Sequence, residues 1–138
     1  MKSFEIIEHT ADTGIRAFGS DLKQVFVNAA EGMFSIMVDP SSVDEHQEEK
    51  ITVEADGLDE LLVEWLNELL YLSEVNRMLF KRFIVDKMTE TSLEARAFGE
   101  PIDDSKHELR SDIKAVTYHM LKVEQKNGIW TAQVIFDV

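Results

Sequence analysis

Two stretches of the chain carry apolar residues at helical spacing. Over residues 21–38, apolar side chains recur at i, i+3, i+4 and i+7, which is the pattern of a helix with one buried face. Asp39-Pro40 ends this stretch, because the residue before a proline avoids the α region. A second stripe, made of leucines and Trp65, runs over residues 58–70. The pattern predicts two amphipathic helices that each contribute one face to a hydrophobic core.

Other segments alternate apolar and polar residues with the period of a half-buried strand. Between the last two of them stands Asn127-Gly128, the preferred dipeptide of a tight hairpin turn. The acidic stretch 39–49 follows the first helix and predicts a surface loop. The expected strands are residues 4–8, 14–19, 51–55, 79–88, 92–98, 114–125 and 129–138.

The order of these elements is strands, helix, strand, helix and then several strands. This order predicts an α+β fold, in which two amphipathic helices pack on one face of a mostly antiparallel sheet. A length of 138 residues fits a single domain, so we expect one unit over residues 1–138. The tetrapeptide Arg-Ala-Phe-Gly closes an expected strand at 16–19 and again at 96–99, a weak hint of two related strand units.

The charge balance excludes one class of function. The chain holds 27 acidic against 14 basic residues, a formal net charge of −13. Such a surface repels a phosphate backbone, so we expect no strong direct binding of nucleic acid and a protein partner for any role near RNA. The chain has no cysteine, no signal peptide and no apolar run long enough to span a membrane. We therefore expect a cytoplasmic protein without a membrane role.

The last expected strand runs to the final residue and carries two carboxylates at its end. Chain ends are usually polar and loosely held unless something ties them down. Here Asp137 stands one residue from the α-carboxylate of Val138, and the two repel each other unless a cation or hydrogen-bond donors compensate. If the first and last strands are neighbours, Asp12 joins them. Three oxygen anions would favour a hard cation such as Ca²⁺ or Mg²⁺; the competing reading is that Asp12 caps its own turn.

The remaining candidate residues favour structural roles. The sequence contains no nucleophile elbow, P-loop, dinucleotide fingerprint or HExxH motif. His46 lies among acidic residues and is expected at the surface, whereas His9 and His107 lie in polar turns that they could cap. His119 belongs to an apolar-rich expected strand, where a structural histidine is the ordinary interpretation.

Several blocks of the sequence, in order and over nearly the whole chain, resemble the archease family. The first is His9-Thr10-Ala11-Asp12 followed by Gly14, and the last is the terminal Val134-Ile135-Phe136-Asp137-Val138. Between them lie the matching blocks Phe26 to Phe34, Trp65 to Leu70, Lys106-His107 and Ile113 to His119.

The resemblance implies a specific role. Archeases are small cytoplasmic proteins with strand-helix-strand-strand modules that act as cofactors of the RNA-splicing ligase RtcB in tRNA splicing and RNA repair. They promote guanylylation and turnover of the ligase without being catalysts themselves. The resemblance also implies a bound divalent cation, Ca²⁺ before Mg²⁺ or Mn²⁺, held by Asp12, Asp137 and Val138. It draws attention to Lys106 and Asp112 as further candidates for contacting the partner or supporting the site.

Two other functions stay open at this point. The first is a stand-alone metal-dependent phosphohydrolase that uses Asp12 and Asp137 to hold the metal. The second is a chaperone-like binding module in which the metal is only structural.

Overall fold

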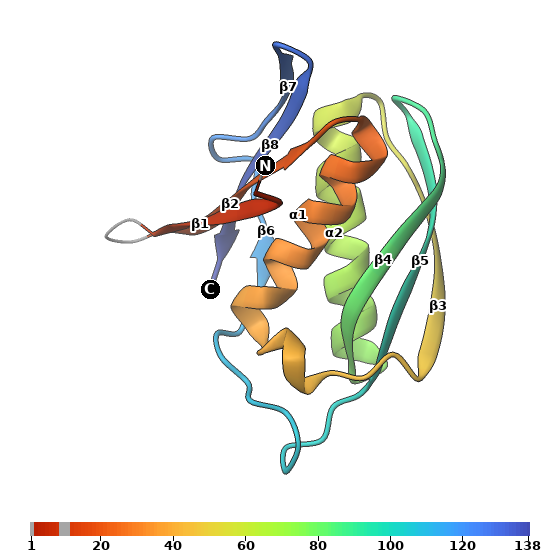
Figure 1. The fold of residues 1–138 in the computed structure, drawn as a ribbon, viewed down its shortest axis with the longest axis vertical. Helices are drawn as coiled ribbons and strands as arrows, with labels where there is room; N and C mark the ends of the chain where they lie inside the picture. Colours follow the sequence, from red (N-terminus) through yellow and green to blue (C-terminus); the bar gives the residue numbers. More distant parts are fainter. Residues whose placement is uncertain (1, 9–11) are drawn as a thin grey trace.

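A computed structural model of the chain describes residues 2–8 and 12–138. Within these ranges two α-helices form, and they lie between two groups of strands (Figure 1). The elements in chain order are β1 (Phe4–Glu8), β2 (Thr13–Gly19), α1 (Leu22–Met37), the 3₁₀ turn η1 (Pro40–Ser42), β3 (Gln47–Glu54), α2 (Leu58–Val75), β4 (Met78–Met88), β5 (Ser92–Pro101), β6 (Ala115–Val116), β7 (Lys122–Lys126) and β8 (Ile129–Asp137).

The strands form two antiparallel sheets. In the first sheet the order is β1-β2-β8-β6, with β7 also paired to β8, and in the second it is β3-β5-β4. The α+β class predicted from the sequence is confirmed. The strands are divided between two sheets rather than joined in one, and the helices cover one face of each (Figure 1).

The position of helix α1 accounts for the division of the strands between two sheets. On one side it approaches the first sheet so closely that a side chain at Gly32 would meet Phe4 and Ile15. On the other side the ring centroid of Phe34 lies 5.6 Å from that of Phe80 and 5.7 Å from that of Phe83, both in β4. An apolar stripe wide enough to contact two sheets therefore buries the helix between them.

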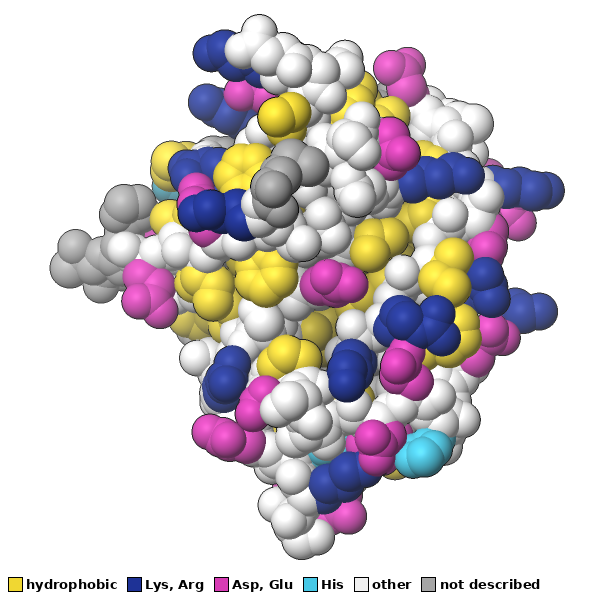
Figure 2. All heavy atoms as spheres, in the orientation of Figure 1, with side chains coloured by type: hydrophobic (Ala, Val, Ile, Leu, Met, Phe, Trp, Pro, Cys, Tyr) yellow, Lys and Arg dark blue, Asp and Glu magenta, His cyan; other side chains and the backbone are white. Residues whose placement is uncertain are grey.

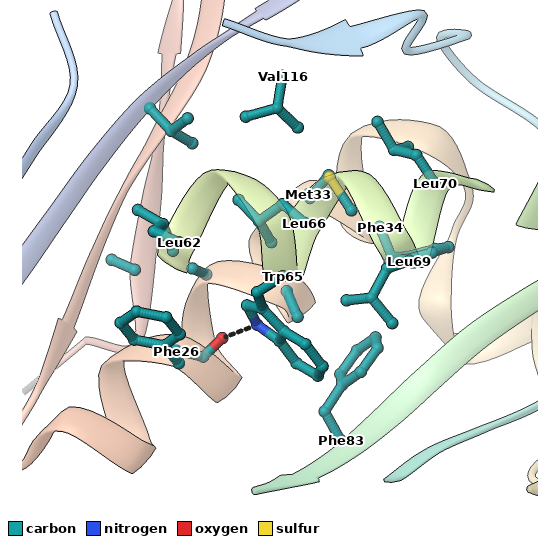
Figure 3. Close-up of a cluster of buried hydrophobic side chains, with 14 of the residues drawn as sticks. Phe26, Met33, Phe34, Leu62, Trp65, Leu66, Leu69, Leu70, Phe83 and Val116 are labelled. Atoms are coloured by element: carbon teal, nitrogen blue, oxygen red, sulfur yellow. Dashed lines mark hydrogen bonds between the residues drawn. The ribbon is translucent and has the colours of Figure 1, made fainter. Parts of the chain in front are cut away.

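The two helices are joined through a large, fully buried aromatic side chain. Trp65 of α2 is fully buried, and its indole Nε1 donates a hydrogen bond of 3.0 Å to the carbonyl of Phe26 in α1 (Figure 3). Its ring meets Phe83 edge to face, at 6.2 Å between centroids. A buried Trp needs a partner for its N–H, and here that partner fixes one helix against the other.

Two predicted boundaries are wrong. Residues 39–49 are not one loop, because they contain η1 and the start of β3 at Gln47. The expected strand 114–125 is interrupted at residues 117–121, and its two parts, β6 and β7, pair separately with β8. The turn is confirmed: Asn127 and Gly128 have φ of 54° and 78°, as a two-residue hairpin turn with left-handed central residues requires. In the described part of the chain, no helix is long and apolar enough to cross a membrane.

Candidate metal centre

Strand β8 lies in the interior of the first sheet. It pairs with β2 along one edge and with β6 and β7 along the other. Ala132, Val134 and Phe136 on one face are buried, and so are Gln133 and Ile135 on the other, so this part of the strand is covered on both faces rather than half-buried as expected. At its end, the Lys114 N–H donates a 2.7 Å hydrogen bond to the carbonyl of Asp137. The strand is therefore held by its backbone up to the penultimate residue.

The sequence argument placed Asp12 beside Asp137 if the first and last strands were neighbours, but β8 pairs with the second strand, β2. Thr13 pairs with Phe136, so the residue before one and the residue after the other, Asp12 and Asp137, are next in the same antiparallel register. Val138 follows directly, at the C-terminus marked in Figure 1. The neighbour of β8 is β2, so Asp12 approaches from the start of the second strand.

The carboxylates at this corner have no cationic partner within residues 2–8 and 12–138. Asp12 is half-buried and Asp137 is exposed, and neither forms a salt bridge there. The set offers oxygen donors only, which fits a hard cation that completes its shell with water. Metal binding by Asp12, Asp137 and Val138 stays a prediction. His9, Thr10 and Ala11 of the first family block lie outside the described residues.

A second group of carboxylates lies between β5 and the loop before β3, and its charges are compensated. The Lys106 ammonium donates to Asp44 at 2.7 Å and to Glu100 at 2.8 Å. The Glu100 side chain is only 9% exposed, and it also accepts a 2.7 Å hydrogen bond from the Asp44 N–H. We call Asp44, Glu100, Lys106 and His107 the Glu100 group.

His107 completes this group from beneath. Its side chain is fully buried, with Nε2 2.9 Å from the Glu100 carboxylate. Its Nδ1 accepts a 2.9 Å hydrogen bond from the Asp103 N–H, which confirms the capping role expected for this histidine. Because Nδ1 accepts a hydrogen bond, the ring proton is on Nε2, and this N–H donates a hydrogen bond to the Glu100 carboxylate. Both ring nitrogens of His107 are therefore used in hydrogen bonds that hold this turn.

These contacts shift the acidity of the group. The Lys106 ammonium, the Asp44 N–H and the His107 ring together lower the pKa of Glu100 from 4.5 to about 2. The hydrogen bond from Lys106 also lowers the pKa of Asp44, and the two carboxylates raise the pKa of Lys106. Asp44, His46 and Glu100 offer atoms within 4.8 Å of one another, but the Lys106 ammonium already bonds both carboxylates. This group is therefore an internal ion-pair network.

The other predicted residues lie in separate surroundings. Lys106 belongs to the Glu100 group, whereas Asp112 is exposed on the segment between β5 and β6. Neither is hydrogen-bonded or ion-paired to Asp12 or Asp137 in the part of the chain that the structure describes. His46 is exposed, as expected.

The interpretation of His119 as a structural histidine in a strand is wrong. The chain leaves the sheet at Thr117, whose hydroxyl donates to the Ile135 carbonyl at 2.8 Å, and His119 is exposed. Sequence reasoning also missed Glu100. Its one local signal is an acidic residue placed between Gly99 and Pro101 at a strand end.

Comparison with known proteins agrees with this architecture. The model of the family described as "Archease protein family (MTH1598/TM1083)" matches residues 4–138. The protein archease of Methanosarcina mazei is 40% identical over 99% of this chain and 97% of its own length. That of Sulfurisphaera tokodaii is 38% identical over the full length of both chains. The chain belongs to the archease family.

Two solved structures resemble this archease fold. The solution structure of Methanobacterium thermoautotrophicum protein 1598 is 39% identical, covers both chains fully and has a TM-score of 0.86. The crystal structure of an archease from Thermotoga maritima, described as a possible chaperone, covers 96% of this chain and 94% of its own. It has a TM-score of 0.64 at 21% identity, so it supports the fold alone.

Proposed function

We propose that this archease is a non-catalytic activator of the RNA-splicing ligase RtcB. It promotes guanylylation and turnover of the ligase in cytoplasmic tRNA splicing and RNA repair. Asp12, Asp137 and the Val138 carboxylate hold a divalent cation, Ca²⁺ in the first place. The observation that carries this proposal is the register of Thr13 with Phe136, which continues to Asp12 and Asp137.

The chemistry of this corner supports a site that faces a partner. A bound divalent cation supplies positive charge that can orient a phosphate oxygen. Asp12 and Asp137 contribute negative oxygen donors at the ends of two paired strands, while the Lys114 N–H holds the Asp137 backbone in place. Asp137 and Val138 are exposed, so a docked protein can reach them.

The charge of the whole chain supports a basic partner. Net charge is −13, and Figure 2 shows acidic side chains spread over the face drawn, with basic ones between them. Complementary charge speeds association and selects partners, and an enzyme that binds RNA presents a basic surface. The ligase supplies the contact with RNA, and this protein contacts the ligase.

Single-turnover guanylylation of purified ligase tests the proposal. We expect the full chain to accelerate the reaction, and Asp12→Asn, Asp137→Asn and a short Gly-Ser extension after Val138 each to reduce that acceleration at least tenfold. Glu124→Gln, which removes an exposed carboxylate on β7, is the matched control and should act as wild type. The assay is repeated in Mg²⁺, Mn²⁺ and Ca²⁺. Normal stimulation by the extended chain would remove the terminal site from the mechanism.

The alternative of a chaperone-like module has one observation in its favour, the description of the Thermotoga maritima relative as a possible chaperone. A chaperone should increase the yield of soluble ligase without changing the guanylylation rate per folded molecule. Measuring both quantities in one titration separates the two functions. Metal-dependent turnover of nucleotides by the isolated protein would instead support the phosphohydrolase alternative.

A further inference from the structure

A cavity of about 680 Å³ opens between the C-terminal end of α2 and the segment that joins β5 to β6. In Figure 1 this region is at the lower end of the molecule, where both helices end. Its volume falls in the range of small-molecule sites. The lining includes neither Asp12 nor Asp137, and nothing in the proposed function uses it.

The floor of the cavity is apolar. Leu70, Leu79 and Ile113 line it, and each is at least nine-tenths buried. Tyr71 stands at the rim with 58% of its surface exposed. A flat or apolar group placed here would cover the tyrosine ring and lose contact with water.

The rim carries an excess of positive charge. Arg77, Arg110 and Lys114 line the cavity together with Glu74 and Asp112, so three basic residues face two acidic ones in a chain of net charge −13. Neither Arg77 nor Lys114 forms a salt bridge within the described ranges. Their charges are therefore available to a ligand.

Arg77 is held in an unfavourable backbone conformation. It lies directly after Asn76, the C-cap of α2, with φ of 54°, a left-handed position where glycine is usual at a helix end. Its carbonyl accepts a 2.8 Å hydrogen bond from the Ile102 N–H, which fixes the turn. Such strain persists where the surroundings enforce it, and it is often found at binding sites. Here the strained position is occupied by an arginine instead of the usual glycine.

Arg110 is anchored to the other helix. Its N–H donates to the Met37 carbonyl at 2.8 Å, and its guanidinium Nη1 donates to the Ser35 carbonyl at 3.0 Å. One guanidinium N–H is used in this way, and the fork has four more. Two of the three cations are thus on backbone that is fixed before any ligand arrives, which lowers the entropic cost of binding.

We propose that this cavity binds a small phosphate monoester with an apolar or aromatic body. Arg77, Lys114 and the remaining donors of Arg110 bind the phosphate, and the body lies over the apolar floor beside Tyr71. Glu74, Asp112 and the negative ends of the α1 and α2 dipoles oppose the anion and limit its affinity. The proposal is independent of the ligase and of the terminal carboxylates.

Titration of the ¹⁵N-labelled full chain with phenyl phosphate, phenol and inorganic phosphate tests the class of ligand. Phenyl phosphate should bind at least tenfold more tightly than either fragment, because only it engages both the cations and the floor. The amide shifts should centre on residues 109–114 and on Arg77. Equal binding of inorganic phosphate, or shifts centred elsewhere, would overturn the proposal.

Charge-changing variants test whether the cavity selects an anion or a cation. Arg77→Gly suits the left-handed position, so it should keep or raise the melting temperature while weakening phenyl phosphate about tenfold. Glu74→Gln should tighten binding two- to fivefold, and Lys81→Gln, exposed on β4, should change neither. A cavity built for a cation would respond in the opposite direction to Arg77→Gly and Glu74→Gln, and that result would refute the proposal.

Discussion

The fold holds two separate groups of carboxylates, and the structure shows cationic partners within the described ranges for only one of them. In the Glu100 group, a lysine ammonium, a histidine ring and a backbone N–H all donate to one carboxylate. At the corner of Asp12, Asp137 and Val138, the described residues supply no such cation. The charges of the first group are paired within the fold, whereas no ion pair neutralises Asp12 or Asp137 in the described ranges.

Burial explains why the two groups differ. The Glu100 side chain is 9% exposed, and a charge so far from water must be paired in the fold or protonated. Asp137 is exposed, so water can hydrate its charge and soften the repulsion from its neighbours. We therefore expect folding to tolerate the absence of a cation at the terminal corner better than the loss of the donors around Glu100.

The largest effect is expected from Glu100→Gln. This change leaves the Lys106 ammonium with one fewer carboxylate and removes the charge that the Asp44 N–H and His107 bind. Hydrogen bonds to a charged group contribute about 2 kcal/mol, and solvent screening at the partly exposed Lys106 keeps the expected loss of unfolding free energy near that figure. Urea denaturation at pH 7 measures the loss, with Glu124→Gln as the exposed-carboxylate control. An unchanged unfolding midpoint would mean that the Glu100 group is not an anchor.

The same contrast predicts a pH dependence. The pKa of Glu100 is about 2 in the folded protein and 4.5 ordinarily, so the unfolded chain takes up its proton first on acidification. The stability that Glu100 contributes is complete above pH 4.5 and is lost as pH falls toward 2. The stability gap between wild type and Glu100→Gln should therefore narrow below pH 4.5. A gap that stays constant from pH 7 to pH 3 would contradict this assignment.

A smaller effect is expected from Lys106→Met. The lysine side chain is 37% exposed, so solvent screens its two ion pairs. We expect the melting temperature to fall by about 3 °C, less than for Glu100→Gln. Combining it with Asp44→Asn in a double-mutant cycle measures the coupling between the two partners. Strictly additive changes would show that the 2.7 Å contact contributes nothing to stability.

The helices were predictable from the sequence because their signals are local. The stripe around Trp65 and the turn at Asn127-Gly128 each depend on residues a few positions apart. The start of β3 was not predictable, because charged residues such as Glu48 on this edge strand obscure the alternation of apolar and polar residues. The segment 117–121 keeps the composition of a strand. Its backbone hydrogen bonds to β8 stop at Thr117, and the Leu121 N–H then donates to the Tyr118 carbonyl in a turn.

The two carboxylate groups differ in the same respect. The Glu100 group joins residues 44, 100 and 106–107, and no motif connects positions that far apart. At the terminal corner, Asp137 and Val138 are adjacent in sequence. Only the strand that lies beside the last one, and brings Asp12 to them, had to be assumed. The pairing of β2 with β8 supplies that neighbour, which burial patterns alone could not have chosen among eight strands.

The smallest effect on the cation-free protein is expected from Asp137→Asn. This change removes one of two adjacent exposed anions and keeps the side-chain shape, so the melting temperature in EDTA should stay within about 2 °C of wild type. With CaCl₂ added, the wild type should gain stability because the folded state alone brings Asp12 to Asp137, whereas the variant should gain little. Differential scanning calorimetry in EDTA and across a CaCl₂ series measures both quantities, with Glu124→Gln as control. A large loss in EDTA would place the terminal carboxylates with the Glu100 group as internal structure, whereas an equal gain in wild type and variant would locate the cation elsewhere.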